Sequence, residues 1–397
     1  MHGWNSGQIR AGRIAALVAA ALGVGCGSAD GTEDADAVTA AAQDVKQING
    51  QNVFRYDTFG DEQKWTDQLR MHEVVASSVS PLTALAVGLK VDADALPPGV
   101  LETADLDSPA TTVALLSLDA VVGLKGKVDD AGNLVELGIT CALCHSTVDD
   151  SVAPGIGHRL DGWPNTDLDP GLIISLSPAL TDAQRAVYSS WGPGFYDPRY
   201  NIDGINAPVV IPPAYGLAGV PLETFTGDGP VSYWNAYVAI TQMGGKGDFS
   251  DPRLGISIDV KKDLVTPKLP ALFAYQMSLA APAAPEGSFD PAAAARGREV
   301  FEGQGRCASC HTGSTYTDAG TTLHDASETQ MDPLYATRSA TGQYRTTPLR
   351  GLWQHAPYFH DGSAATLTEV VEHYQAALDL GLSDAQKGDL AEFLQSL

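Results

Sequence analysis

Two short segments of the chain carry the same pattern of residues that can hold a metal cofactor. Cys141-Ala142-Leu143-Cys144-His145 and Cys307-Ala308-Ser309-Cys310-His311 are both CxxCH motifs. Two thiols spaced in this way can form thioethers with the two vinyl groups of one haem, and the histidine that follows can bind the iron as proximal ligand. The sequence therefore predicts two covalently attached haems c, held by Cys141, Cys144, His145, Cys307, Cys310 and His311.

Paired cysteines can also form a disulfide, a thioredoxin-like dithiol or part of a zinc site. A zinc site requires its four ligands to be close together, whereas the two motifs lie far apart in the sequence. A redox dithiol does not need the histidine. Together the motifs use every cysteine except Cys26, which favours haem attachment.

The composition excludes several classes of function. The 397 residues include 24 Lys+Arg and 48 Asp+Glu, a formal net charge of −24, and 44% of them are hydrophobic. A globular core is expected, while the acidity argues against nucleic-acid binding and against docking on anionic lipid. The negative net charge favours association with a basic soluble electron-transfer protein, such as a small cytochrome or a cupredoxin.

The N-terminus is typical of an export signal. Arg10 and Arg13 precede the apolar stretch 14–24, so residues 1–25 are predicted to be a signal peptide and residues 26–48 a flexible acidic tether. Cys26 stands where a lipoprotein signal places its lipidated cysteine; the alternative is an ordinary signal with a stray cysteine. We expect a periplasmic or cell-envelope protein of a Gram-negative bacterium, in contact with a membrane only through that lipid.

The remaining chain predicts a mainly α fold with two class I cytochrome c-like haem domains, long loops and an N-terminal extension. The first haem domain with its extension is expected over residues 49–285 and the second over 286–397. A helix should begin at Asp290-Pro291, where proline takes the first helical position, and a terminal helix should begin at the capping box of Ser383 to Gln386 and cross it.

Three segments of the second half resemble a known family. Residues 344–352 (YRTTPLRGL), 356–363 (APYFHDGS) and 366–374 (TLTEVVEHY) are similar to the dihaem cytochrome c peroxidase and MauG superfamily. The resemblance is close over 289–397 and weaker over 139–245. It implies that the C-terminal haem transfers electrons and that the N-terminal haem reacts with an oxidant.

The resemblance also implies roles for single residues. Tyr374 stands fourteen residues after His360, where peroxidases of the family have an axial methionine and the MauG branch a tyrosine. A phenolate ligand would favour Fe(III). The alternatives are that Tyr374 is a packing residue and that His373, Met331 or another histidine binds the iron.

A calcium ion between the domains is a further expectation from the resemblance. Asn206, His355 and Pro357 match the places from which the family takes an asparagine side chain and backbone oxygens. Such hard oxygen atoms suit Ca²⁺. The alternative is that Asn206 only turns the chain before Pro208.

The region of the first haem departs from the family. The stretch Phe225–Gly229 lacks the tryptophan that family members have between the haems, for which Trp234 is a possible substitute. Gln242 replaces the glutamate that precedes a methionine, and an amide cannot exchange a proton as a carboxylate does. Ordinary peroxidase chemistry is therefore in doubt.

Other residues could take part at the first haem. Asp228 or Asp161 could replace the glutamate, and His158 is the best candidate for a distal ligand, unless it only bonds to a loop carbonyl. The catalytic candidates are thus Gln242, Asp228 and His158. The leading hypothesis is an exported dihaem cytochrome with peroxidase-like activity on hydrogen peroxide. A non-catalytic dihaem electron carrier and a MauG-like oxidase or oxygenase of an organic substrate are the alternatives.

Overall fold

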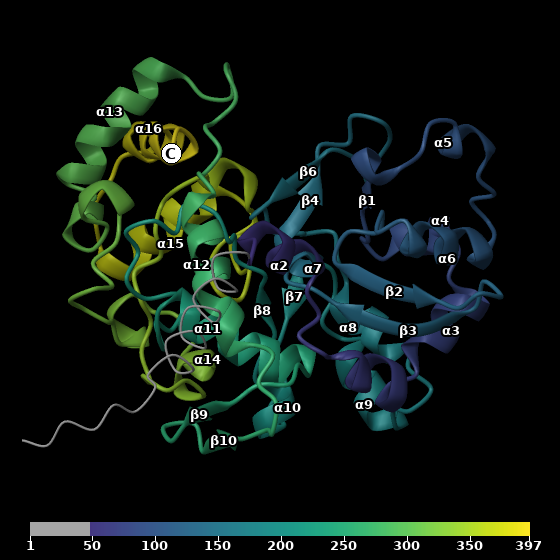
Figure 1. The fold of residues 1–397 in the computed structure, drawn as a ribbon. Coiled ribbons are helices and arrows are strands. Elements are labelled where there is room, and N and C mark those ends of the chain that lie inside the picture. Colours follow the sequence, from purple (N-terminus) through teal and green to yellow (C-terminus); the bar gives the residue numbers. More distant parts are fainter. Residues whose placement is uncertain (1–47) are drawn as a thin grey trace, which may run out of the picture. The chain divides into compact units, whose positions relative to one another are not determined.

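The computed structural model describes residues 48–397, and Figure 1 shows the arrangement of their helices and short strands. The predicted signal peptide, Cys26 and nearly all of the predicted tether lie outside this range. Residues from Gln47 to Leu397 form one compact unit. The predicted boundary between residues 285 and 286 falls inside this unit and stays a prediction. None of the helices in residues 48–397 has the length and apolar character of a membrane span.

Helices dominate the described residues, as predicted. The α-helices are α2 (Gly50–Tyr56), α3 (Met71–Ser78), α4 (Pro81–Ala86), α5 (Val100–Thr103), α6 (Pro109–Ser117), α7 (Ala142–His145), α8 (Pro170–Ser175), α9 (Asp182–Tyr188), α10 (Tyr200–Asp203), α11 (Val231–Tyr237), α12 (Leu269–Ser278), α13 (Pro291–Glu302), α14 (Leu334–Thr337), α15 (Leu367–Leu378) and α16 (Asp384–Gln395). Two π-helical segments are η1 (Gln63–Gln68) and η3 (Val238–Met243). Short 3-10 turns include η5 (Cys307–Ser309) and η8 (Leu352–Gln354).

The strands within residues 48–397 are short and pair two at a time. The pairs are β1 (Val91–Asp92) with β5 (Ile156–Gly157), β2 (Leu124–Val128) with β3 (Leu134–Ile139), β4 (Ser146–Val148) with β6 (Arg159–Asp161), β7 (Phe195–Tyr196) with β8 (Val209–Val210), and β9 (Phe249–Asp251) with β10 (Ile256–Ile258). Only β1 and β5 are parallel. Such pairs are too small to be stable by themselves, so they depend on packing against the helices.

The first CxxCH motif lies at the seam between two apolar clusters. One cluster contains α3, α6 and β3, and Cys144 packs against it. The other contains α2, α11, η3 and α12, and Cys141 packs against it. The two cysteines of one motif therefore contact different parts of the core; Cys141 is the N-cap of the short helix α7, and Cys144 lies within it.

The C-terminal part is built on two crossing helices, as the sequence predicts. Asp290 caps α13, since its carboxylate accepts hydrogen bonds from the backbone N–H groups of the first turn, and the capping box of Ser383 and Gln386 starts α16. At the crossing, a Cβ atom on Gly297 would lie 1.9 Å from the carbonyl oxygen of Asp389. Only glycine permits this approach, which brings Phe301 and Phe393 into edge-on contact (ring centroids 5.2 Å apart).

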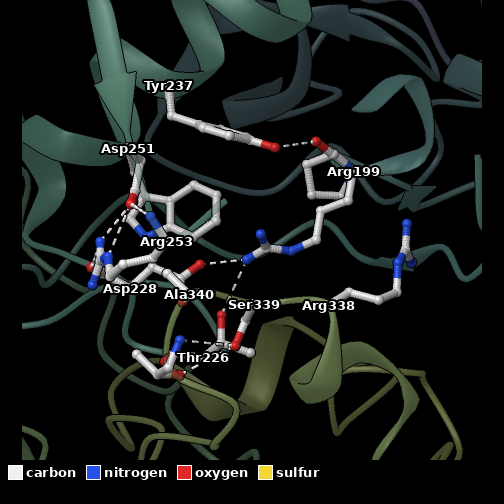
Figure 2. A network of polar contacts seen from close by, with 12 residues as sticks. Arg199, Thr226, Asp228, Tyr237, Asp251, Arg253, Arg338, Ser339 and Ala340 are labelled. Atoms are coloured by element: carbon white, nitrogen blue, oxygen red, sulfur yellow. Dashed lines mark hydrogen bonds and ion pairs between the residues drawn. The ribbon is translucent and has the colours of Figure 1, made fainter. Parts of the chain in front are cut away.

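Buried ion pairs join the C-terminal part to the preceding loops. Arg338 pairs with Asp197 and Asp203, at 3.0 and 2.7 Å, and its side chain is 3% exposed. Close by, Arg199 pairs with Asp228, whose other oxygen accepts the N–H of Ala340, as Figure 2 shows. Because a buried charge without its partner is costly, these pairs fix the loops against each other.

Candidate haem-binding sites

The second CxxCH motif opens onto a large apolar cavity. Its volume is about 850 Å³, within the range of roughly 300–1,000 Å³ that is usual for cofactor pockets. The motif follows α13 directly, and α15 and α16 form further walls. The apolar lining residues include Phe301, Leu349, Leu352, Leu367, Val370, Val371, Leu390 and Leu394.

His311 lines this cavity and is oriented by the backbone. Its Nδ1 lies 3.0 Å from the carbonyl oxygen of Tyr316. A carbonyl can only accept, so Nδ1 carries the proton and Nε2 keeps a free lone pair for a metal. Burial lowers the pKa of His311, which keeps the imidazole neutral. The ring is therefore prepared as an axial ligand.

The two thiols of this motif are free and line the same cavity. Burial raises the pKa of Cys307 to about 11, and that of Cys310 is also raised. They are therefore not the acidic, reactive thiolates of a redox enzyme. Neutral thiols beside an apolar cavity suit thioether attachment of a porphyrin.

Three residues that line the cavity each have one buried polar atom without a hydrogen bond. Nε of Arg345, Oε1 of Glu223 and Oγ1 of Thr224 have no hydrogen bond. Buried polar atoms are rarely left in this state. Haem carries two propionates, and a guanidinium next to a hydroxyl is a suitable partner for a carboxylate. The residues present therefore fit a haem c, which Cys307, Cys310 and His311 would hold. Sequence reasoning missed these groups, because Arg345 is distant in the sequence from Glu223 and Thr224.

The structure narrows the choice of second axial ligand. Tyr374 and Met331 both line the cavity, whereas His373 does not, and its Nε2 donates to the carbonyl oxygen of Thr329 at 2.8 Å. Tyr374 projects from α15, and burial raises the pKa of its phenol. His355 and His360 line the cavity as well, but Nε2 of His360 lies 3.0 Å from the Tyr344 hydroxyl.

A second group of metal-ligand types was not expected from the sequence. Ligand atoms of Cys310, Asp318 and His324 lie within 4.8 Å of one another. His324 also contacts Glu328, at 2.9 Å. A thioether bond to haem would occupy the sulfur of Cys310. The rest of the group is then a histidine, His324, that pairs with the acidic side chains of Asp318 and Glu328 at the edge of the cavity.

The first motif repeats the orientation of the histidine. Nδ1 of His145 lies 3.0 Å from the carbonyl oxygen of Pro212, so Nε2 is again free, and burial lowers the pKa of His145 to about 4. Cys141 and Cys144 are free. The donor set therefore fits haem attachment. Cys141, Cys144 and His145 do not line the large cavity, so a haem attached to them would require the seam between the two apolar clusters to widen.

Gln242 lies in a small cavity beside this seam. The cavity has a volume of about 50 Å³ and is also lined by Lys64, Trp65 and Tyr196. The Gln242 side chain is buried, and its Oε1 accepts a hydrogen bond from the Tyr196 hydroxyl at 3.0 Å. Cys144 and Tyr196 pack against the same apolar cluster, but the lining residues of the cavity do not include Cys141, Cys144 or His145.

His158 is not brought to the first motif. It is exposed and pairs with Asp94 at 2.9 Å. It precedes β6, whose pairing places Asp161, not His158, opposite Ser146, the residue after His145. Asp161 is buried, and its carboxylate accepts hydrogen bonds from Ser146 and Arg55, at 2.8 and 2.5 Å.

Asp228 and Trp234 both contact Arg199. Asp228 is neutralised by Arg199, as Figure 2 shows, and is 5% exposed. Trp234 belongs to the apolar cluster that holds Cys141, and its indole donates to the carbonyl oxygen of Glu223 at 3.1 Å. Since Glu223 lines the large cavity, Trp234 connects the surroundings of both motifs.

The three residues expected at a calcium site have different surroundings. His355 and Pro357 line the large cavity. Asn206 does not, and its exposed side chain accepts from the indole of Trp191, at 2.8 Å, and contacts Ser190. The described contacts do not join Asn206 to the other two.

Comparisons with known proteins agree with this geometry. Residues 342–376 match a family described as RoxA-like, cytochrome c-like. The methylamine utilization protein MauG of Methylorubrum extorquens is 30% identical over 122 residues, which cover 26% of this chain and 34% of that protein. The chain thus matches about a third of the length of this curated relative.

Two solved structures are similar to parts of the fold. One is a hydrazine synthase of Kuenenia stuttgartiensis, with 17% identity, a TM-score of 0.33 and coverage of 48% of this chain and 73% of that chain. The other is a MauG-like protein associated with microbial copper homeostasis, with 23% identity, a TM-score of 0.26 and coverage of 33% and 56%.

The C-terminal region with its cavity is a cytochrome c-like domain. The matches support the assignment of the chain to a MauG/cytochrome c peroxidase-like family, as the sequence motifs predicted. This assignment implies covalently bound haem c.

The pair of Arg345 and Glu223 gives a prediction about stability. Burial raises the pKa of Glu223 to about 7, and Arg345→Met would raise it further. A carboxyl that is protonated only in the folded state costs stability as pH rises, by about 1.4 kcal/mol per pH unit up to its folded pKa. Between pH 7 and 8.5 the free energy of unfolding of the variant should therefore fall more steeply than that of the wild type, as measured by urea denaturation.

The control for this prediction is the double variant Arg345→Met/Glu223→Gln. Its amide does not titrate, so the additional slope should disappear. Equal slopes in the single and double variants would show that Glu223 is not the titrating group.

Proposed function

We propose that the protein is an exported dihaem c-type cytochrome, in which the C-terminal haem transfers electrons and the N-terminal haem reacts with an oxidant. The observation that carries the proposal is the repeated histidine geometry. In both motifs Nδ1 is bonded to a backbone carbonyl at 3.0 Å, and Nε2 is left for iron. Haem supplies one-electron redox chemistry.

The residues of the second cavity support electron transfer. The apolar walls exclude water, Arg345 and Thr224 offer partners to propionates, and Tyr374 offers an axial oxygen. Tyr374 as ligand would stabilise Fe(III) and lower the reduction potential relative to a methionine. A haem closed on both faces passes electrons and does not bind substrate.

The first site differs in its protonation chemistry. Gln242 stands at the place of the family's glutamate, and its amide is held by Tyr196. Hydrogen peroxide is the proposed oxidant. Oxidation of an organic substrate, as in a MauG-like oxidase or oxygenase, is a second candidate, which the loss of the carboxylate favours. A dihaem electron carrier is the third.

Further parts of the proposal concern the surroundings of the protein. We place it in the periplasm or cell envelope of a Gram-negative bacterium, with a lipid at Cys26. The net charge of −24 suits a basic cytochrome or cupredoxin as electron-transfer partner. A calcium ion at Asn206 remains part of the proposal and would require Trp191 to share the amide oxygen.

The number of haems can be counted directly. A pyridine haemochrome assay on protein from a host with cytochrome c maturation should give two haems per chain. Replacing Cys141 and Cys144 with serine, or Cys307 and Cys310 with serine, should leave one, because each pair forms its own thioethers. A single haem in the wild-type protein would refute the proposal.

Tyr374→Phe tests the axial ligand. The substitution removes one oxygen and should change the low-spin absorption and electron paramagnetic resonance spectra of one haem. Tyr358→Phe is the matched control, since Tyr358 lines the same cavity but its hydroxyl is bonded to the carbonyl oxygen of Leu352, at 2.9 Å. If the spectra of both variants were identical to those of the wild type, Tyr374 would be excluded as a ligand.

Stopped-flow mixing with hydrogen peroxide separates an enzyme from a carrier. If the first haem reacts with an oxidant, the absorption of the oxidised or half-reduced protein should change at a rate proportional to peroxide concentration. A carrier with both irons fully ligated should be inert in both states.

A further inference from the structure

A histidine at the edge of the large cavity lies between two carboxylates. Nδ1 of His324 is 2.9 Å from Glu328, and its Nε2 is 3.4 and 3.2 Å from the two oxygens of Asp318. An ionised carboxylate can only accept, so the bond to Glu328 places a proton on Nδ1. In the neutral ring, Nε2 then has a lone pair that faces the Asp318 carboxylate. Two acceptors that face each other need a cation between them, which is either a second proton or a metal ion.

The spacing of Nε2 and the Asp318 oxygens suits a metal ion. Two ligands bound at about 2.0–2.1 Å in a tetrahedral arrangement lie roughly 3.3 Å apart, and the observed separations are 3.4 and 3.2 Å. A charged N–H···O bond is usually shorter, at about 2.7–2.9 Å. The sulfur of Cys310 is also near, since the ligand atoms of Cys310, Asp318 and His324 lie within 4.8 Å of one another.

Glu328 holds the imidazole as a metal ligand would need to be held. Metal-binding histidines usually donate their other N–H to a carboxylate, which fixes the tautomer and makes the ligand nitrogen more basic. Glu328 is itself fixed, because its other oxygen accepts the N–H of Asp325, at 2.9 Å, in the capping box of the 3-10 turn η7 (Ala326–Glu328). Glu328 is therefore a positioning residue.

The backbone keeps His324 and Asp318 in place. His324 and Tyr344 exchange both of their backbone hydrogen bonds, at 2.7 and 2.8 Å. The carbonyl oxygen of Asp318 accepts the N–H groups of Thr321 and Thr322, at 2.8 and 3.0 Å. Because these residues are fixed before an ion binds, little conformational freedom is lost on binding.

The group is negatively charged and can be reached from solvent. Among the ion pairs of residues 48–397, Asp318 and Glu328 pair only with His324. The Glu328 side chain is 52% exposed. Burial opposes the charged imidazole, yet the bonds to Glu328 and Asp318 raise the pKa of His324 above its usual value. The surroundings therefore favour a positive charge at this point.

We propose that Asp318 and His324 bind one divalent transition-metal ion, such as Zn²⁺, at the edge of the large cavity. When haem is attached, Cys310 offers only a neutral thioether as a weak further donor, and water completes the coordination. The imidazole selects such an ion over Ca²⁺ and Mg²⁺, which prefer oxygen ligands alone. The site does not depend on the reaction proposed for either haem.

Calorimetric titration of the haem-loaded chain, free of any affinity tag, with Zn²⁺ tests the proposal. The wild type should bind one Zn²⁺ that excess Ca²⁺ and Mg²⁺ do not displace. His324→Gln and Asp318→Asn each remove a ligand and should weaken this binding at least about tenfold. His158→Gln is the matched control, because His158 also pairs with a carboxylate, that of Asp94, but is exposed and has no second carboxylate partner among the ion pairs of residues 48–397.

Glu328→Gln separates the positioning role from a structural one. Glutamine also serves in a capping box, so η7 is retained while the carboxylate is lost. Zn²⁺ binding should weaken about tenfold, as is typical for the outer partner of a ligating histidine. With Cu²⁺ as probe, pulsed electron paramagnetic resonance should show modulation from the remote Nδ1 of one imidazole. This signal should persist with a changed frequency in Glu328→Gln and disappear in His324→Gln.

The opposite results are equally clear. Haem absorption spectra that match the wild type would show that the variants are folded. If the wild type then bound no Zn²⁺, or if His324→Gln and Asp318→Asn bound it as tightly as the wild type, the metal site would be excluded. His324 would in that case be a protonated imidazole that bonds to two carboxylates.

Discussion

The histidine of each CxxCH motif depends on one hydrogen bond to a backbone carbonyl. The bond fixes the tautomer, so that Nε2 rather than Nδ1 is available to iron, and it fixes the plane of the ring. Both acceptors, Pro212 and Tyr316, lie in irregular segments outside the motifs. In the proposed cytochrome these loops would take part in iron binding, because without their carbonyls the motif supplies the ligand but not its orientation.

Burial determines the charge state of most functional groups. Apolar walls keep His145 and His311 neutral and the four motif thiols protonated. Several buried charges within residues 48–397 are paired, as for Arg338 and Asp197. Lys64 is largely enclosed, and none of the ion pairs found in these residues includes it. An enclosed cation without an ion-pair partner lowers stability.

Short sequence patterns predicted the features that depend on residues close together in the chain. The cap at Asp290 and the capping box at Ser383 follow from spacing within a few residues. The crossing of α13 with α16 was expected only from the resemblance to cytochrome c domains. Contacts between distant segments were beyond such reasoning. Examples are the bond of Gln242 to Tyr196 and the pair of Arg345 with Glu223.

His158 shows why distance along the chain is a poor guide to ligation. It lies close to the first motif in sequence, yet the hairpin of β4 and β6 carries it to the surface, where it pairs with Asp94. Conversely, Trp234 is remote in sequence but packs in the apolar cluster that holds Cys141. The two CxxCH motifs could be recognised in the sequence because covalent attachment of haem requires residues that lie close together in the chain.

The contact between His145 and Pro212 has a consequence for the spacing of the two sites. The carbonyl oxygen of Pro212 accepts a hydrogen bond from Nδ1 of His145, and Pro212 also forms part of the wall of the second cavity, together with Ile211 and Pro213. Two consecutive prolines have restricted φ angles and form a stiff strut. In the dihaem cytochrome that we propose, such a shared support would hold the separation of the two haems constant, and electron tunnelling between them is steeply sensitive to that separation.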